Sequence, residues 1–373
     1  MKYRALYPPS ILGVMGSGQL GRMFTHSASK LGYHVHCYSP IFDSPTKYAG
    51  ATEFVGKYTD LNKLGEFLDS VDALTFEFEN IPEEALLFIE EYIETEGLRV
   101  FPSPKVIRIS NNRIKEKNFF LNIGIPVTNF LSLQGKFTDI NKLSDIKFPA
   151  ILKTNQFGYD GKGQRKYNTR EDFLTDLISI NIFDNILEEV VDFDLEVSVI
   201  GARLSNGKII TYPPSENIHK NHILDLTIHP ARISEKLKKE AEEHTRNLLE
   251  KIDYIGVLGL EFFVKDDLLL GNEFAPRPHN SGHFSMDSAN YSQFDLQVLC
   301  LTGIIEDLDI KTYPSVMKNM VGEEFFKDKE TFKKLIEKSK YNIHLYQKKE
   351  VLSGRKMGHI NYRGEYDDNL FLF

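Results

Sequence analysis

The chain has 373 residues, which allows two or three domains with sizeable cores, and its 41% hydrophobic and 26% charged residues are typical of a globular protein. A formal net charge of −8 argues against non-specific binding to nucleic acid, which needs a basic face. No apolar run reaches membrane-spanning length and no signal-peptide pattern opens the chain, so we expect a cytoplasmic protein. Cys37 and Cys300 lie in apolar contexts, which predicts buried thiols in a reducing compartment.

A glycine-rich loop follows the first predicted strand. The strand covers 11–15, the G-x-G-x-x-G loop covers 16–21, and a helix over 22–31 and a strand over 34–39 complete a βαβ unit. Free backbone N–H groups at the start of such a helix attract anions. A dinucleotide site also needs an acid after the second strand, where Tyr38-Ser39-Pro40 stands instead. The loop therefore predicts a phosphate site for another ligand, or only close packing of helix on strand.

Two acids end a later strand of this region. The strand at 73–78 leads into Glu77 and Glu79, which are two positions apart and therefore share a face. Ligands of open α/β sheets bind at the carboxyl ends of strands. A ligand contact and the capping of the helix over 81–92 remain equal alternatives for these acids.

The middle of the chain combines a lysine with a glycine-rich loop. Lys153 closes the apolar strand over 148–152, and the loop over 157–164 follows with three glycines. A lysine in this place either extends along the surface or faces a phosphate. Exposed glycine N–H groups can close over a polyphosphate, so the pair favours a phosphate-binding lid over a plain hairpin. Downstream, 187–192 and Glu196 fit an adenine hinge and a ribose contact, or simply an amphipathic strand.

Two glutamates flank a turn near the centre of the C-terminal half. Glu261 and Glu273 lie on apolar runs joined by Asp266-Asp267, and a tail over 277–283 offers cationic and amide donors for an anion. The glutamates would hold Mg²⁺ if they share a face, and would otherwise be a solvated pair on an edge hairpin. A two-residue turn would place Glu261 opposite Asn272, whereas a turn with an odd number of residues would place it opposite Glu273. We predict the odd turn.

Seven motifs run in one order along nearly the whole chain: GSGQLGRM at 16–23, FEFENIP at 76–82, FGYDGKGQ at 157–164, ENIHKN at 216–221, NEFAPRPHNSGH at 272–283, YSQFD at 291–295 and GRKMGH at 354–359. With these motifs the chain resembles the ATP-grasp superfamily and, within it, the N5-carboxyaminoimidazole ribonucleotide synthetase (PurK) family. One departure is Lys162, which stands where relatives carry Arg and so replaces a two-pronged donor with a point charge.

The resemblance implies an α/β fold that is α+β in its ATP-binding part. A Rossmann-like parallel-sheet domain is expected at 1–104, a central domain with a glycine-rich ATP lid at 105–186, and a C-terminal ATP-grasp domain with the metal and bicarbonate site at 187–373. The implied activity is ATP- and bicarbonate-dependent carboxylation of the amine of 5-aminoimidazole ribonucleotide through carboxyphosphate. The implied cofactor is Mg²⁺, and the implied assembly is a homodimer.

The resemblance also implies roles for individual residues. The expected ATP contacts are Arg113, Lys153, Gly158, Tyr159, Asp160, Gly161, Lys162, Gly163, Gln164, Glu188, Glu189, Val190, Val191, Glu196, His219, Asn272 and Glu273. The expected metal ligands are Glu261 and Glu273. The expected contacts of the aminoimidazole ribonucleotide are Gly18, Gln19, Glu77, Glu79, Tyr159, Lys162, Arg355 and Lys356. The expected catalytic residues are Lys153, Arg277, His279 and Asn280, and the proton acceptor for the amine stays open between His279 and the glutamates at 77 and 79.

Three other functions compete with this one. Another ATP-grasp ligase, such as a biotin carboxylase or a glycinamide ribonucleotide enzyme, is disfavoured by the PRPHNSGH and GRKMGH motifs. A non-catalytic nucleotide-binding protein is disfavoured by the presence of Lys153, Glu261 and Glu273. A nicotinamide-dependent dehydrogenase is disfavoured by the missing acid after the second strand.

Overall fold

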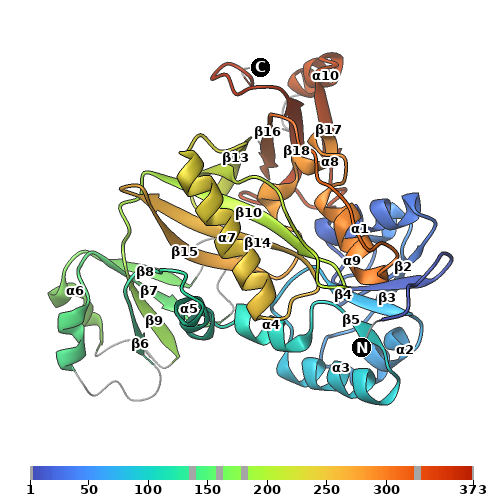
Figure 1. The fold of residues 1–373 in the computed structure, drawn as a ribbon, viewed down its shortest axis with the longest axis horizontal. Coiled ribbons are helices and arrows are strands. Elements are labelled where there is room, and N and C mark those ends of the chain that lie inside the picture. The colour runs from blue at the N-terminus through green and yellow to red at the C-terminus, as the bar shows by residue number, and fades with distance from the viewer. Residues whose placement is uncertain (1–2, 134–139, 157–162, 178–183, 323–328, 372–373) are drawn as a thin grey trace.

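A computed structural model describes residues 3–133, 140–156, 163–177, 184–322 and 329–371, and this part of the chain folds around three sheets (Figure 1). The N-terminal sheet is parallel, with the strand order β3-β2-β1-β4-β5. Its strands are β1 (Ile11–Met15), β2 (His34–Ser39), β3 (Thr52–Val55), β4 (Ala73–Phe76) and β5 (Arg99–Val100). The helices of this region are α1 (Gln19–Lys30), the 3-10 helix η1 (Lys47–Ala49), α2 (Leu61–Leu68) and α3 (Glu83–Thr95).

Helices cover both faces of the N-terminal sheet, which is why its strands are apolar runs rather than alternating ones. Leu12 and Val14 of β1 pack on one face with α1 and with α9 (Gln293–Thr302), a helix from far along the chain. Met15 and the side chains of β4 at Leu74 and Phe76 pack on the other face with α2 and α3. The sheet confirms the expected Rossmann-like start of the chain, and α9 fastens it to the C-terminal part.

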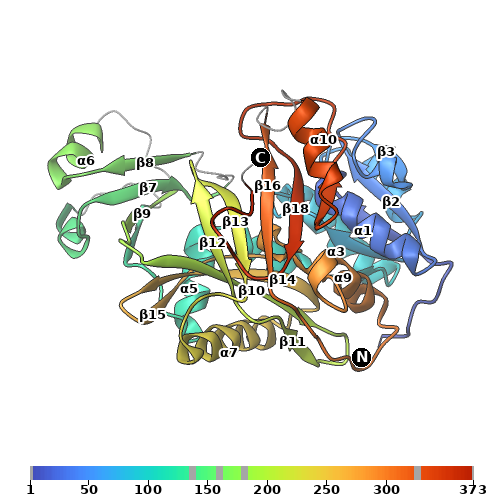
Figure 2. The ribbon, with the colours of Figure 1, turned by 90° about the horizontal axis from the view of Figure 1, so that it is seen from above.

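The central sheet is antiparallel and runs β15-β14-β10-β12-β13-β16-β18-β17, with β11 paired to β10. Figure 2 shows α7 (Glu235–Lys251) lying along one face of this sheet, where Leu248 and Leu249 join the core cluster. The strands are β10 (Leu195–Arg203), β11 (Ile209–Thr211), β12 (Ser215–Lys220), β13 (Ile223–His229), β14 (Gly256–Lys265), β15 (Leu268–Ala275), β16 (Ser315–Val321), β17 (Tyr341–Leu345) and β18 (Lys356–Arg363). The remaining helices here are α4 (Pro104–Ser110), α5 (Arg113–Asn122), η3 (Asn280–Gly282), α8 (Ser285–Ser288) and α10 (Lys329–Glu337).

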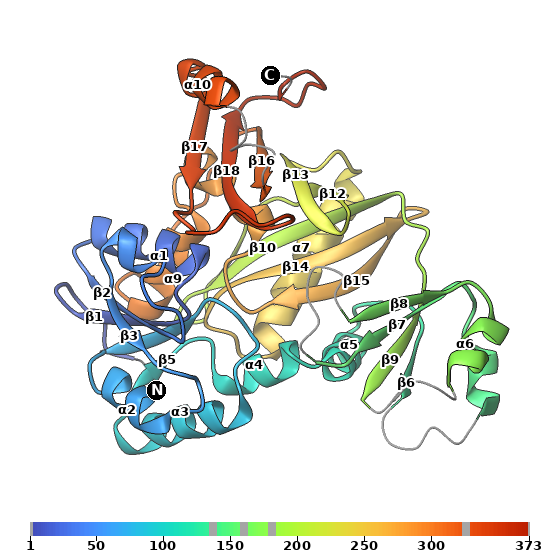
Figure 3. The same cartoon turned by 180° about the vertical axis from the view of Figure 1, so that it is seen from behind.

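The third sheet is small and has the order β6-β9-β7-β8. It contains β6 (Phe130–Leu133), β7 (Ala150–Thr154), β8 (Gln164–Tyr167) and β9 (Asn185–Glu189), with η2 (Ile140–Asp145) and α6 (Arg170–Leu177) beside it. Figures 1 and 3 show it on the opposite side of the central sheet from the N-terminal sheet. Among the described residues, no helix is both long and apolar enough to span a membrane.

The turn between β14 and β15 differs from our prediction. Lys265 pairs directly with Leu268, so the turn consists of Asp266 and Asp267 alone, both with left-handed backbones (φ 49° and 58°). Two left-handed residues are the conformation of a type I′ hairpin turn, in which aspartate is well tolerated. The predicted odd turn is therefore wrong.

A β-bulge further along the same hairpin nevertheless brings the two glutamates to one face. Phe262 pairs with Gly271 but Leu260 pairs with Phe274, so Asn272 and Glu273 together lie opposite Glu261. In a regular strand Leu269 and Phe274 would lie on opposite faces, because an odd number of positions separates them. The extra residue of the bulge lets both side chains enter the core. The predicted common face of Glu261 and Glu273 is right, and the bulge supplies it.

The bulge has support from the helix beneath it. The backbone N–H of Phe274 donates to the buried Glu116 carboxylate of α5 at 2.8 Å. A Cβ added to Gly271 would lie 2.8 Å from Ile125 and 3.2 Å from Phe120, so only a glycine lets α5 and its following loop approach the strand.

Gly271→Ala should therefore destabilise the fold by about 1–3 kcal/mol through overpacking against Phe120 and Ile125. The free energy of unfolding is measured by urea denaturation. Leu268→Ala, at an exposed position of the same strand, serves as control and should change stability by less than about 0.5 kcal/mol. Equal effects of the two substitutions would contradict this account of Gly271.

Candidate functional site

A cavity of about 1070 Å³ lies where the three sheets meet. Almost every described residue that the sequence singled out lines it: Gly18, Gln19, Glu77, Glu79, Arg113, Lys153, Gln164, Glu188, Glu189, Val190, Val191, Glu196, His219, Glu261, Asn272, Glu273, Arg277, His279, Asn280, Arg355 and Lys356. Gly163 stands outside this lining but pairs with β7, where its carbonyl accepts from the Thr154 N–H at 3.0 Å. The predicted lid contacts Gly158, Tyr159, Asp160, Gly161 and Lys162 lie outside the described residues.

One end of the cavity holds two lysines on a single buried carboxylate. Lys153 at the end of β7 donates to Glu188 of β9 at 2.7 Å, and the ammonium of Lys117 lies 3.6 Å from the other oxygen of Glu188. Burial alone would raise the pKa of Glu188, but Lys153 and Lys117 outweigh it and lower the pKa to about 2. The Glu188 side chain is thus a counter-ion for the lysines, and only its backbone remains for an adenine hinge.

The sequence analysis missed Lys117. It lies four positions after Arg113 on α5, so both side chains leave the same face of the helix, and the Lys117 side chain reaches Glu188 behind the cavity wall. Lys117 is almost fully buried, and burial, first of all, lowers its pKa. The i, i+4 spacing of two cations was the signal that could have identified it.

Aromatic and polar side chains line the wall of the cavity beside the expected adenine hinge. Phe193 and Phe263 stack with ring centroids 4.8 Å apart and line the cavity, which gives a planar ligand an aromatic wall. Beside them, Glu196 and His219 share a hydrogen bond of 2.5 Å between Oε2 and Nδ1. The sequence pattern suggested Glu196 for a ribose, but it contained no sign of the aromatic wall.

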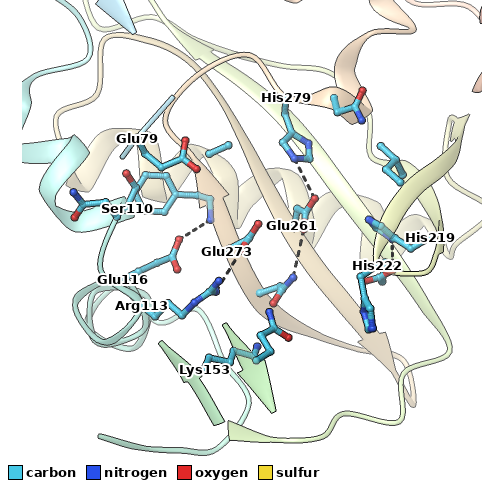
Figure 4. Close-up of a pocket in the computed structure, with 18 of the residues that line it drawn as sticks. Glu79, Ser110, Arg113, Glu116, Lys153, His219, His222, Glu261, Glu273 and His279 are labelled. Atoms are coloured by element: carbon cyan, nitrogen blue, oxygen red, sulfur yellow. Dashed lines mark hydrogen bonds and ion pairs between the residues drawn. The ribbon is translucent and has the colours of Figure 1, made fainter. Parts of the chain in front are cut away.

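Glu261 and Glu273 form the centre of the site (Figure 4). Asn272 Nδ2 lies 3.4 Å from Glu261, and Arg113 lies 3.5 Å from Glu273. Burial, and then the charge of Glu273, raises the pKa of Glu261 to about 8. Two carboxylates on one face with a single arginine beside them fit Mg²⁺, which is held by few carboxylates and completes its shell with water and phosphate. Within the described parts of the chain, no cluster of three or more His, Cys, Asp or Glu suits a metal ion.

The tail after β15 carries the anion-binding candidates. Arg277 Nε lies 2.8 Å from Glu79 Oε2, and its Nη2 lies 3.3 Å from Oε1, so Glu79 occupies one edge of the guanidinium. Burial alone would raise the pKa of Glu79, but Arg277 lowers it below its usual range. Both amide atoms of the Asn280 side chain are buried and have no hydrogen-bond partner among the described residues. An unpartnered buried amide on a cavity wall indicates a ligand contact.

The glycine loop binds a carboxylate of its own chain. The N–H groups of Gly18 and Gly21 each donate at 2.6 Å to the Glu77 carboxylate. A Cβ at Gly16 would lie 2.1 Å from Glu77, and at Gly18 2.8 Å, so these glycines make room for that side chain. The anion site at the start of α1 therefore exists, and Glu77 fills it.

Three cations from the C-terminal part of the chain also line the cavity. Arg355 and Lys356 line it as predicted, and Lys348 joins them although the sequence analysis did not select it. The Lys348 ammonium donates to the Gln19 side chain and, at 2.6 Å, to the Lys356 carbonyl. Its pocket role could not be read from the QKKE sequence, which looks like an ordinary exposed loop.

Comparison with known proteins gives the family. Three family models match consecutive parts of the chain: a ribonucleotide synthetase preATP-grasp domain at 10–111, an ATP-grasp domain at 118–294 and a phosphoribosylaminoimidazole carboxylase C-terminal domain at 315–370. The N5-carboxyaminoimidazole ribonucleotide synthase of Brucella melitensis biotype 1 is 36% identical over 96% of this chain and 98% of its own length. The chain belongs to the N5-carboxyaminoimidazole ribonucleotide synthetase family.

Solved structures agree with this membership. The Staphylococcus aureus N5-carboxyaminoimidazole synthetase in complex with ADP matches with a TM-score of 0.88 and 34% identity over 97% of this chain and 95% of that one. The Aspergillus clavatus N5-carboxyaminoimidazole synthase in complex with ADP and 5-aminoimidazole ribonucleotide matches with a TM-score of 0.85 and 26% identity over 96% and 95%. The expected α/β fold with an ATP-grasp part is confirmed, and this synthetase family, a family of ATP-grasp ligases, replaces the dehydrogenase alternative.

Glu188→Gln tests the lysine–carboxylate cluster. The folded-state pKa of Glu188 lies below the ordinary value of about 4.3, so its ion pairs stabilise the fold above that value and are lost as the pH falls towards about 2. The variant should be less stable than the wild type by a few kcal/mol near pH 7, since two buried lysines lose their partner. The difference should shrink near pH 3.

Urea denaturation at both pH values measures the effect. Glu250→Gln, at an exposed position of α7, is the control and should follow the wild type at each pH. A Glu188→Gln variant whose deficit stayed constant between the two pH values would contradict the assigned ion pairs.

Proposed function

We propose that this synthetase carboxylates the amine of 5-aminoimidazole ribonucleotide with ATP and bicarbonate, giving N5-carboxyaminoimidazole ribonucleotide, ADP and phosphate. The observation that carries the proposal is one cavity in which the lysine–carboxylate cluster, the paired glutamates and the Arg277–Asn280 tail meet. The relatives' names and the ADP and 5-aminoimidazole ribonucleotide in the Aspergillus clavatus complex support it.

The chemistry proceeds in two steps. Bicarbonate is a poor electrophile, so one of its oxygens first attacks the γ-phosphorus of ATP, which releases ADP and forms carboxyphosphate. The substrate amine then attacks the carbon, phosphate leaves, and the nitrogen gives up a proton. Phosphoryl transfer needs mainly in-line positioning and neutralisation of charge. Lys153 and Arg113 supply positive charge at the nucleotide end, and Glu188 holds Lys153 in place.

Glu261 and Glu273 would hold Mg²⁺. When bound, Mg²⁺ neutralises phosphate oxygens and polarises the transferred phosphoryl group. The two carboxylates come from neighbouring strands of a rigid hairpin, with Arg113 against Glu273 and Asn272 against Glu261. This arrangement fixes their spacing before any ligand arrives, so little reorganisation accompanies binding.

Arg277 and Asn280 form the bicarbonate end. We assign Glu79 to orienting Arg277 rather than to contacting the substrate, because Glu79 already occupies the Nε edge of the guanidinium. The remaining guanidinium hydrogens and the unpartnered Asn280 amide are suited to a small planar anion. Exclusion of water from this end during the reaction would protect the acyl phosphate, which hydrolyses readily.

The cations at the far end suit the substrate's phosphate. Lys348, Arg355 and Lys356 would bind it, and Gln19 and Glu77 would face the rest of the ribonucleotide. Tyr159 and Lys162 keep their proposed role as substrate contacts. The division into parts at 1–104, 105–186 and 187–373, the homodimer and the cytoplasmic location also remain proposals.

Phosphate release from ATP tests the function. Release should require bicarbonate and rise strongly on addition of 5-aminoimidazole ribonucleotide. The absence of release under every condition would contradict the enzyme, and dependence on biotin or glycinamide ribonucleotide would move it to another ATP-grasp ligase.

Glu273→Gln should abolish measurable turnover, because it removes one of two charged metal ligands, while its circular dichroism and unfolding midpoint stay close to those of the wild type. Glu250→Gln should retain full activity. Wild-type turnover by Glu273→Gln would show that the metal assignment is wrong.

A further inference from the structure

A chain of buried polar side chains reaches the ring of His279 from behind. Ser281 Oγ lies 2.8 Å from His279 Nδ1, Ser198 Oγ donates to Ser281 Oγ at 2.7 Å, and Asn217 Nδ2 donates to Ser198 Oγ at 2.9 Å. Thr227 Oγ1 closes the chain by donating to Asn217 Oδ1 at 3.1 Å. Ser281 and Thr227 are 0% exposed, Ser198 1% and Asn217 4%, so water does not replace these partners.

The direction of the hydrogen bonds follows from the amide of Asn217. Its oxygen accepts from Thr227, so its nitrogen donates to Ser198. A serine hydroxyl has one hydrogen. Since Ser198 gives its hydrogen to Ser281, the hydrogen of Ser281 is left for His279 Nδ1.

The opposite side of the imidazole faces the site. Because Nδ1 accepts, the ring is neutral and carries its proton on Nε2. Nε2 lies 3.2 Å from Glu261 Oε1 in the cavity (Figure 4). The chain of hydroxyls therefore presents an N–H donor, and not a lone pair, to the reacting end of the site.

The backbone of His279 is fixed as firmly as its ring. Gln293 of α9 accepts from the His279 N–H at 2.8 Å and donates to the His279 carbonyl at 2.8 Å. Gly259 of β14 lies directly beneath, where a Cβ would approach His279 Cβ to 2.5 Å. These contacts fix the backbone and Cβ of His279, and the hydrogen bond from Ser281 to Nδ1 then orients the ring.

We propose that Ser281 is a positioning residue which, through Ser198 and Asn217, holds His279 with its proton on Nε2, so that His279 serves as a hydrogen-bond donor at the bicarbonate end. It follows that His279 does not accept the proton of the substrate amine. The inference deepens the proposed carboxylation, on which its catalytic part rests. A donor here stabilises negative charge as it develops on the oxygens of bicarbonate and of the acyl phosphate.

The protonated nitrogen can be observed directly. Nitrogen-15 NMR of the full chain labelled at its 11 histidines distinguishes the two neutral imidazole forms, and the spectrum of His279→Gln identifies the signal of His279. The wild type should show His279 protonated at Nε2. A proton on Nδ1 would overturn the proposal without any kinetic measurement, and this readout does not depend on whether the proposed reaction is correct.

Substitutions test the role of the hydrogen-bonded side chains behind His279. Ser281→Ala should add a signal from the form protonated at Nδ1 and lower kcat roughly tenfold, as the loss of one hydrogen bond predicts, with little change in KM for ATP. Ser281→Thr keeps the hydroxyl and should retain the Nε2 form. Ser288→Ala is the matched control: its buried hydroxyl has no hydrogen-bond partner in the described parts of the chain, and its loss should change neither NMR signal nor kcat.

Two results would contradict the proposal: an unchanged His279 signal in Ser281→Ala, or an equal loss of activity in Ser288→Ala. Ser198→Ala provides a second measurement if Ser281→Ala does not fold, and it should also mix the two forms of His279. A wild type that forms the Nε2 species but releases no phosphate would contradict the proposed function and leave the assignment of the proton in place.

Discussion

The β-bulge between β14 and β15 is the constraint on which the site depends. A regular hairpin closed by Asp266 and Asp267 would send Glu261 to the cavity and Glu273 into the core. The extra residue in β15 lets Phe274 stay in the core while Glu273 turns outward. Packing therefore enforces the common face of the two proposed metal ligands, because returning Glu273 to the regular register would bury an ionised carboxylate and expose a phenylalanine, and both changes are unfavourable.

Charged side chains of the cavity are paired with other groups of the protein in the absence of a ligand. Glu188 lies between two lysines, Glu79 pairs with Arg277, and Glu77 accepts from the glycine loop. The Glu79–Arg277 pair joins the N-terminal region to the tail after β15, and the Lys117–Glu188 pair joins α5 to the small sheet. Glu261 lacks such compensation, and burial with Glu273 nearby raises its pKa. The missing positive charge marks the place for a cation.

Local sequence patterns predicted the separate parts of this site better than the tertiary contacts between those parts. The strand-loop-helix at the N-terminus, the lysine strand and the hairpin glutamates were readable because each depends on neighbours in sequence. Asp266-Asp267 also indicated a two-residue turn, since aspartate tolerates left-handed backbone, and our odd turn ignored that signal. The bulge was not readable, because it depends on the contact of Phe274 with Glu116 of α5. Likewise, no local pattern could place Glu77 on the glycine loop or Lys348 beside Gln19.

Helix α9 explains why one half of the chain cannot build this site alone. It packs beside α1 against the N-terminal sheet, where Gln297 donates to Thr75 of β4 at 3.1 Å. From its first turn, Gln293 fixes the backbone of His279 on the central sheet. The residues proposed for the substrate, on the glycine loop, and those proposed for bicarbonate, after β15, are thus held by one rigid helix. Packing in a dense core sets the separation of these two groups of residues, and such positioning is what the proposed reaction between two bound species needs.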